Sequence, residues 1–316
     1  MPQPNQRNDG TPSPTRPAGP SIACRLAVLM AIVMFAGCST HSRHSAGLWP
    51  EPEHDAPVTP RTLVLHAADY QSLYTLAGGL KPMSSGFWRC SFDADDPEPG
   101  ELHEVQGMLG VLRNDVWYAD IQIFAKIYDG ERSAQAFVVH RESLARLIDR
   151  HESFWSEWDI TPDTDPRELV HIVDRMPRED RWRGYGYLYG YPDEAVDFFV
   201  EAGIAADDGG EMGPGKDREF MQIPTYAAES GHFTYAIPLD HVPTPADRAL
   251  AEDAGRILEE YERQRPQMRD AEDAVRVLRE LNDQFERPAN SEPAEPDESV
   301  ESGPSAPLRT NAVGNR

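Results

Sequence analysis

The sequence predicts an α+β fold: a small, mainly antiparallel sheet with amphipathic helices packed on it, and a helical C-terminal end. Strand-like alternation is clearest in residues 116–140, where apolar side chains recur at every second position on either side of Asp129-Gly130, a pair typical of a tight hairpin turn. After this hairpin, apolar residues recur at intervals of three and four, which places them on one face of a helix. This spacing is found in three segments, 141–158, 165–177 and 245–286.

Strands and helices are both expected ahead of this hairpin. The predicted elements are a strand, a helix and a second strand, at residues 62–66, 67–77 and 87–92. Gly78 and Gly79 are expected to end the helix, because glycine readily adopts the left-handed backbone of a helix C-terminus. Residues 102–112 have helical spacing, but Gly107 and Gly110 leave a strand as the alternative.

Helices dominate the second half of the predicted fold. The helix at 165–177 begins with a cap, a first-turn proline and a capping-box acid: Asp165, Pro166 and Glu168. We also expect a helix at 192–203 and a second hairpin with its turn at Ser230-Gly231. Two helices that Pro266 separates complete the domain.

Residues 182–191, WRGYGYLYGY, are the most unusual internal stretch. In a strand, the period of two would place all four tyrosines on one side, as an aromatic platform that stacks on sugars or binds peptides. The alternative is that the rings pack into the core. The candidate ligand-binding residues are Trp182, Tyr185, Tyr187, Tyr189 and Tyr191.

The N-terminal segment has the layout of a secretory signal peptide. Arg25 precedes ten apolar residues at 26–35, which are too few to span about 30 Å of hydrocarbon, and small residues follow. Its end, Phe35-Ala36-Gly37-Cys38, resembles the lipobox of bacterial lipoproteins, although Phe35 stands where leucine is commonest.

This resemblance implies that the chain is cut before Cys38 and that Cys38 carries the lipid. It also implies export to the outer membrane, facing the periplasm, because Ser39 rather than an aspartate follows the cysteine. One acyl chain gives marginal membrane residence, at about 0.8 kcal/mol per methylene, so stable attachment takes the two or three chains of a lipoprotein. The expected parts are a signal peptide at 1–37, a lipidated tether at 38–61, an α+β domain at 62–286 and a disordered acidic Pro/Ser-rich tail at 287–316.

Charge restricts the partners. A net charge of −24 repels nucleic acid phosphates and anionic lipid headgroups, so no nucleic acid partner is expected. The expected membrane contact is therefore the lipid on Cys38. An envelope protein or a glycan is the expected partner of the domain. The oligomeric state stays open, with coiled-coil pairing through 245–286 as one option.

No motif in the sequence predicts catalysis. Residues 210–217 nearly match a P-loop, but Asp217 stands where a hydroxyl must ligate magnesium. The histidines lack zinc-site spacing and the aspartate loops lack the EF-hand pattern, so we expect no metal and no cofactor. Cys90 is either a nucleophile or, as expected, a small buried residue.

The leading functional hypothesis is therefore a non-enzymatic lipoprotein of the cell envelope, a structural or partner-binding module held at a membrane. The alternative is a carbohydrate- or peptidoglycan-directed binding protein or hydrolase that uses residues 182–191.

Overall fold

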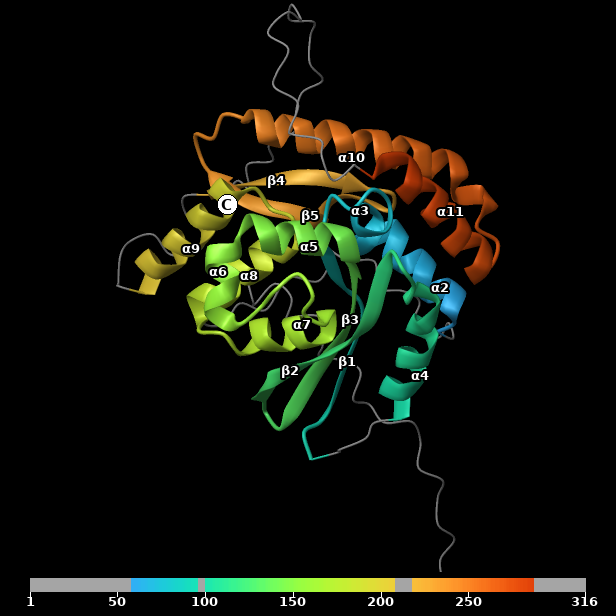
Figure 1. The fold of residues 1–316 in the computed structure, drawn as a ribbon, viewed down its shortest axis with the longest axis horizontal. Helices are drawn as coiled ribbons and strands as arrows, with labels where there is room; N and C mark the ends of the chain where they lie inside the picture. The colour runs from blue at the N-terminus through green and yellow to red at the C-terminus, as the bar shows by residue number, and fades with distance from the viewer. Residues whose placement is uncertain (1–57, 96–99, 208–217, 287–316) are drawn as a thin grey trace, which may run out of the picture.

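The computed structural model describes residues 58–95, 100–207 and 218–286 and confirms the α+β class (Figure 1). The predicted signal peptide, Cys38, most of the tether, the P-loop-like residues 210–217 and the tail lie outside these residues. Within the described part, no helix is both long enough and apolar enough to cross a bilayer.

A three-stranded antiparallel sheet organises the fold. Its strands are β1 (Met83–Asp93), β2 (Trp117–Tyr128) and β3 (Glu131–His140). The order is β1-β3-β2, so β3 is central and the other two strands are edges. The predicted hairpin is confirmed: Asp129 and Gly130 both have positive φ, at 50° and 84°, which matches the right-handed twist of the strands they join.

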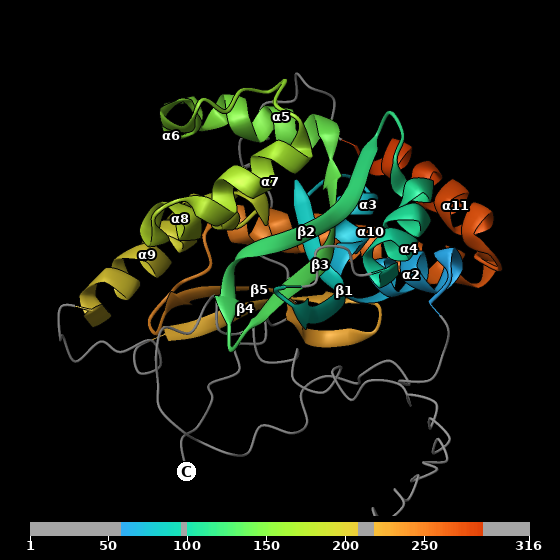
Figure 2. The ribbon, with the colours of Figure 1, turned by 90° about the horizontal axis from the view of Figure 1, so that it is seen from below.

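Helices cover both faces of this sheet, and Figures 1 and 2 show the two layers. One layer holds α2 (Pro60–His66), α4 (Gly100–Met108) and α11 (Ala271–Phe285). The other holds α5 (Arg141–Arg150), α7 (Pro166–Arg175) and α8 (Arg178–Leu188). Alternation along β2 and β3 explains the arrangement, since Ala119 and Val138 face the first layer and Phe137 faces the second.

The first and last described helices pack against each other. Helix α11 contacts α2, and both bury apolar side chains in the core cluster that contains Trp117. Helix α2 continues into η3 (Ala67–Ser72), a π-helical turn, and α3 (Leu73–Leu76). The ends of the described domain therefore close the same layer of the core.

A two-stranded hairpin forms a second, smaller sheet. Its strands are β4 (Arg218–Thr225) and β5 (Ala228–Pro238), and they pack against α9 (Asp193–Asp207) and α10 (Pro245–Gln264). The connection η4 (Leu109–Leu112) continues α4, which resolves residues 102–112 as helical. Short α6 (Glu152–Trp155), η5 (Ser156–Trp158) and η6 (Arg265–Gln267) complete the described elements.

Several helix predictions are confirmed. Asp165 caps α7, accepting hydrogen bonds from two backbone N–H groups, and Pro166 is the first helical residue. Thr244 caps α10 through a capping box with Asp247. Helix α9 runs past Gly203, the predicted end, to Asp207.

The predicted strand at 62–66 is wrong, because this segment is helix α2. Thr59 caps the helix, Pro60 occupies its first position, and Thr62 completes the reciprocal capping hydrogen bonds. A proline after a threonine is a helix start, which outweighs the β propensity of the apolar residues that follow. Those residues, Leu63, Val64 and Leu65, are buried against the sheet.

The predicted turn at Ser230-Gly231 is also wrong. The hairpin turns at residues 226–227, since Thr225 pairs with Ala228. Pro224 has no N–H to donate to the ladder, and the pairing slips opposite it. Gly231, with φ of 93°, lies in the resulting bulge, where its N–H donates to the Gln222 side chain at 2.9 Å.

Candidate functional site

The tyrosine stretch is helical as far as Leu188, so the strand that would have placed all four tyrosines on one side does not form. Tyr185 and Tyr187 lie in α8 and are only 4% and 8% exposed. Gly184 and Gly186 allow close packing here: a Cβ at Gly186 would lie 2.8 Å from Val196. The two glycines let helix α8 pack closely against its neighbours, and the alternation of tyrosines in the sequence does not predict this packing.

The structure brings three of the five predicted aromatic residues together and separates the other two. Tyr185 and Tyr189 stack with their centroids 5.8 Å apart, and half-buried Tyr191 lies 5.9 Å from Tyr189. Tyr187 instead stacks on His151 at 3.9 Å, and Trp182 packs edge-on against Phe199. These rings contribute to the interior, so they support the core interpretation.

A row of buried amides connects this aromatic group to the sheet. Gln135 Nε2 on β3 donates to Gln122 Oε1 on β2 at 3.0 Å, and Gln122 Nε2 donates to the Tyr185 hydroxyl at 2.6 Å. Burial raises the pKa of Tyr185 well above its usual range, so the hydroxyl stays protonated. The row is satisfied internally and fixes α8 on the sheet.

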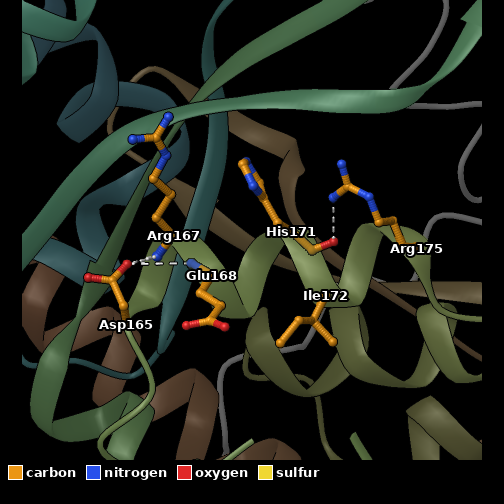
Figure 3. A pocket seen from close by; sticks show the side chains of 6 residues that line it. All are labelled: Asp165, Arg167, Glu168, His171, Ile172 and Arg175. Atoms are coloured by element: carbon orange, nitrogen blue, oxygen red, sulfur yellow. Dashed lines mark hydrogen bonds between the residues drawn. The ribbon is translucent and has the colours of Figure 1, made fainter.

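A shallow surface depression lies on α7, beside β2 (Figure 3). Its volume is about 420 Å³, and its lining residues are Asp165, Arg167, Glu168, His171, Ile172 and Arg175. We call it the α7 groove. Figure 3 shows Arg167, His171 and Arg175 extending from α7 toward β2, because residues four apart lie on one face of a helix.

Carboxylates lie near both ends of the α7 groove. Asp120 on β2 is 1% exposed and pairs with Arg113 at 2.9 Å, while Arg167 lies 3.9 Å from its other oxygen. Asp174 accepts a hydrogen bond from the Ala125 N–H of β2 at 2.7 Å. The Asp174 contact occupies a backbone N–H on the outer edge of β2, which helps to protect that edge from pairing with another strand.

Protonation in the α7 groove follows from burial and nearby arginines. Burial and the charges of Arg175 and Arg167 lower the pKa of His171, so its imidazole is neutral at pH 7. Burial and the hydrogen bond to Asp120 raise the pKa of Tyr118 to about 12. The groove therefore offers two exposed guanidinium groups, a neutral imidazole and carboxylates.

This set of groups suits binding. Guanidinium groups form paired hydrogen bonds with carboxylates or phosphates, and the carboxylates of the groove accept hydrogen bonds from hydroxyls or amines. The six lining side chains include no serine, threonine or cysteine to act as a nucleophile beside His171. Sequence reasoning missed this groove, although the spacing of Arg167, His171 and Arg175 on a capped helix could have indicated it.

Two further predictions concern cysteine and metals. Cys90 is buried on β1 in the core cluster, as expected of a small apolar residue. In the described ranges, no group of three or more His, Cys, Asp or Glu side chains is arranged to hold a metal ion.

No protein family, curated protein or solved structure matches this chain.

Proposed function

We propose that this protein is a non-enzymatic lipoprotein of the cell envelope, which holds a partner-binding α+β domain at a membrane. The observation that carries the proposal is the segment from Arg25 to Cys38, in which ten apolar residues and two small residues lead to a cysteine. Acyl chains on Cys38 would supply the membrane affinity that an acidic surface lacks.

The α7 groove is the proposed partner-binding surface. Its arginines are exposed and its lining mixes donors and acceptors, which suits a polar envelope partner such as a protein or a glycan. The burial of Tyr185 and Tyr187 favours core packing of these rings over the aromatic platform of the carbohydrate alternative. We therefore retain partner binding as the single proposed function.

Labelling with radioactive palmitate tests the anchor. In a diderm bacterial host, we expect the wild-type chain to take up label and to fractionate with membranes, and Cys38→Ala to do neither. Cys24→Ala is the matched control, because no apolar run precedes Cys24 and its loss is expected to leave labelling intact. A wild-type chain that takes up no label and stays soluble would remove the proposal.

A further inference from the structure

Four basic side chains lie close together near the centre of the domain, where its three clusters of buried apolar residues meet. One of them is buried and the other three are half-buried. The four residues are Lys81, which follows α3; Arg89 on β1; His232 on β5; and His66 at the end of α2. We call them the basic cluster. Tyr191, which packs against all three apolar clusters of the described domain, lies next to Tyr189, whose ring contacts Lys81. Such a gathering is unexpected in a chain with a net charge of −24.

Lys81 is shielded from water, and few hydrogen bonds replace its hydration. It is 3% exposed, and its Nζ donates one long hydrogen bond of 3.4 Å, to the Gln71 carbonyl. The Nζ also lies 4.8 Å from the ring centroid of Phe233 and 5.7 Å from that of Tyr189. Burial lowers the pKa of Lys81 to about 7, because these contacts do not replace hydration.

Arg89 cannot relieve its burial by losing a proton, since arginine stays charged in proteins. Its Nε is buried without a hydrogen-bond partner, and no ion pair joins Arg89 or Lys81 to a carboxylate in the described residues. Arg265 shows the usual arrangement, because its Nε and Nη2 each donate to Asp69 at 2.7 Å. Arg89 thus carries a charge that the described part of the chain does not compensate.

The backbone around Arg89 is shaped to admit its guanidinium group. The pairing of β1 with β3 is interrupted between Ser85 and Arg89. Gly86, with φ of 87°, lies in this bulge, and a Cβ there would clash with the Arg89 guanidinium. β-Bulges commonly redirect side chains at binding sites, and a π-helical turn, here η3 against β1, is frequent at such sites.

The remaining groups face the same interior region. Burial, together with the charges of Lys81, His66 and Arg89, lowers the pKa of His232 to about 4. Tyr189 interacts with both cations, through its ring with Lys81 and electrostatically with Arg89, and its hydroxyl is 2.8 Å from the Ser85 Oγ. The side chains around Lys81 and Arg89 therefore provide cationic and hydroxyl hydrogen-bond donors.

We propose that Lys81 and Arg89, with the Ser85 and Tyr189 hydroxyls, form a binding site for a phosphate group, either free or as a phosphomonoester. A dianionic ligand would compensate both cations, and its acceptor oxygens match a site that presents donors. The Arg89 side chain is half-buried, so the site is reached from its side of β1. This proposal is independent of the lipid anchor and of the α7 groove.

Thermal unfolding of the full chain in detergent tests this site. Phosphate, phenyl phosphate and chloride are titrated at constant ionic strength, and calorimetry measures the heat of binding in parallel. We expect phosphate to raise the unfolding midpoint of the wild type in a saturable way, and chloride to leave it unchanged. Arg89→Gln and Lys81→Met are expected to weaken the apparent phosphate affinity by about tenfold or more, which corresponds to the loss of a charge-assisted contact.

Arg263→Gln is the matched control, because Arg263 is exposed and pairs with Glu260 outside the cluster. If phenyl phosphate binds as well as phosphate, the site accepts phosphomonoesters. If phosphate binds and phenyl phosphate does not, the site takes the free anion. Lys81→Met and Arg89→Lys serve as second variants if Arg89→Gln does not unfold cooperatively. A wild type that phosphate neither stabilises nor binds with measurable heat would overturn the proposal, as would variants that keep wild-type affinity.

Discussion

The α7 groove and the basic cluster both hold basic side chains, but they balance the charge differently. In the groove, Arg167 lies near Asp120 and is half exposed to water. In the cluster, Lys81 is buried and Arg89 has no carboxylate partner in the described residues. A balanced exposed charge contributes little to stability, whereas an unbalanced buried charge opposes folding until a ligand compensates it. The α7 groove is therefore an exposed surface with balanced charge, whereas the basic cluster lacks a counter-charge among the described residues.

The largest change in stability is expected from Asp120, the buried carboxylate beside the α7 groove. Asp120 accepts hydrogen bonds from Tyr118 and Gln106 and pairs with Arg113, so Asp120→Ala leaves three donors without their acceptor. We expect a loss of about 3 kcal/mol in the free energy of unfolding, measured by urea denaturation. Glu168→Ala, in the same groove but exposed, is the control and should change stability by less than about 0.5 kcal/mol. Equal losses in the two variants would contradict this account of the groove.

Two arginines provide the next test. Arg265→Gln breaks a two-pronged ion pair and, among the described residues, leaves the Tyr261 hydroxyl as the side-chain partner of the Asp69 carboxylate, so we expect a loss of about 2 kcal/mol. Arg89→Gln in phosphate-free buffer removes an unpaired charge and should leave stability unchanged or increase it. Chemical denaturation of both variants measures the difference. A similar loss at Arg89 would indicate that its charge is already compensated.

The pH dependence of stability tests Lys81 directly. An unfolded lysine keeps its proton up to a pKa near 10.5, whereas burial lowers the folded pKa to about 7. Between pH 7 and 9 the unfolded state therefore binds more protons, and stability rises with pH by up to about 1.4 kcal/mol per unit. Lys81→Met should lack this rise, and subtracting its profile from that of the wild type removes the contributions of all other groups. A difference profile that is flat or falls with pH would show that Lys81 keeps its proton in the fold.

The smallest effect is expected from the exposed side of the groove. Arg175→Ala should change the free energy of unfolding by less than about 0.5 kcal/mol, because Arg175 is exposed and its hydrogen bond in the described part of the chain goes to the His171 carbonyl of its own helix. Denaturation in urea measures the change, with wild type as reference. A loss above about 1 kcal/mol would mean that the arginines stabilise the fold and are not free to meet a partner.

The sequence predicted the parts of this fold that depend on local signals. The 116–140 hairpin and the capped helix at Asp165 follow from alternation, turn residues and capping chemistry, which need no knowledge of neighbours. The helix at residues 182–188 was missed because the tyrosine alternation suggested a strand. Contacts of Gly184 and Gly186 with other elements decide the outcome there.

The two sites show the same limit. Arg167, His171 and Arg175 could be placed on one helix face from the sequence, but the position of Asp120 beside them depends on how α7 packs on β2. No local pattern predicts the burial of Lys81, since a lysine two residues after the Gly78-Gly79 pair is normally a solvent-exposed loop residue. Its burial follows from the meeting of η3, β1 and β5 around it.

The contact between α2 and α11 has a consequence for biosynthesis. Within the described domain, the helix that is synthesised first and the helix that is synthesised last pack in the same layer, so the growing polypeptide cannot complete this part of its core until α11 has emerged. The core of the domain therefore stays incomplete during most of its synthesis. An incomplete core of this kind is what a translocation pore that threads extended polypeptides requires of its cargo.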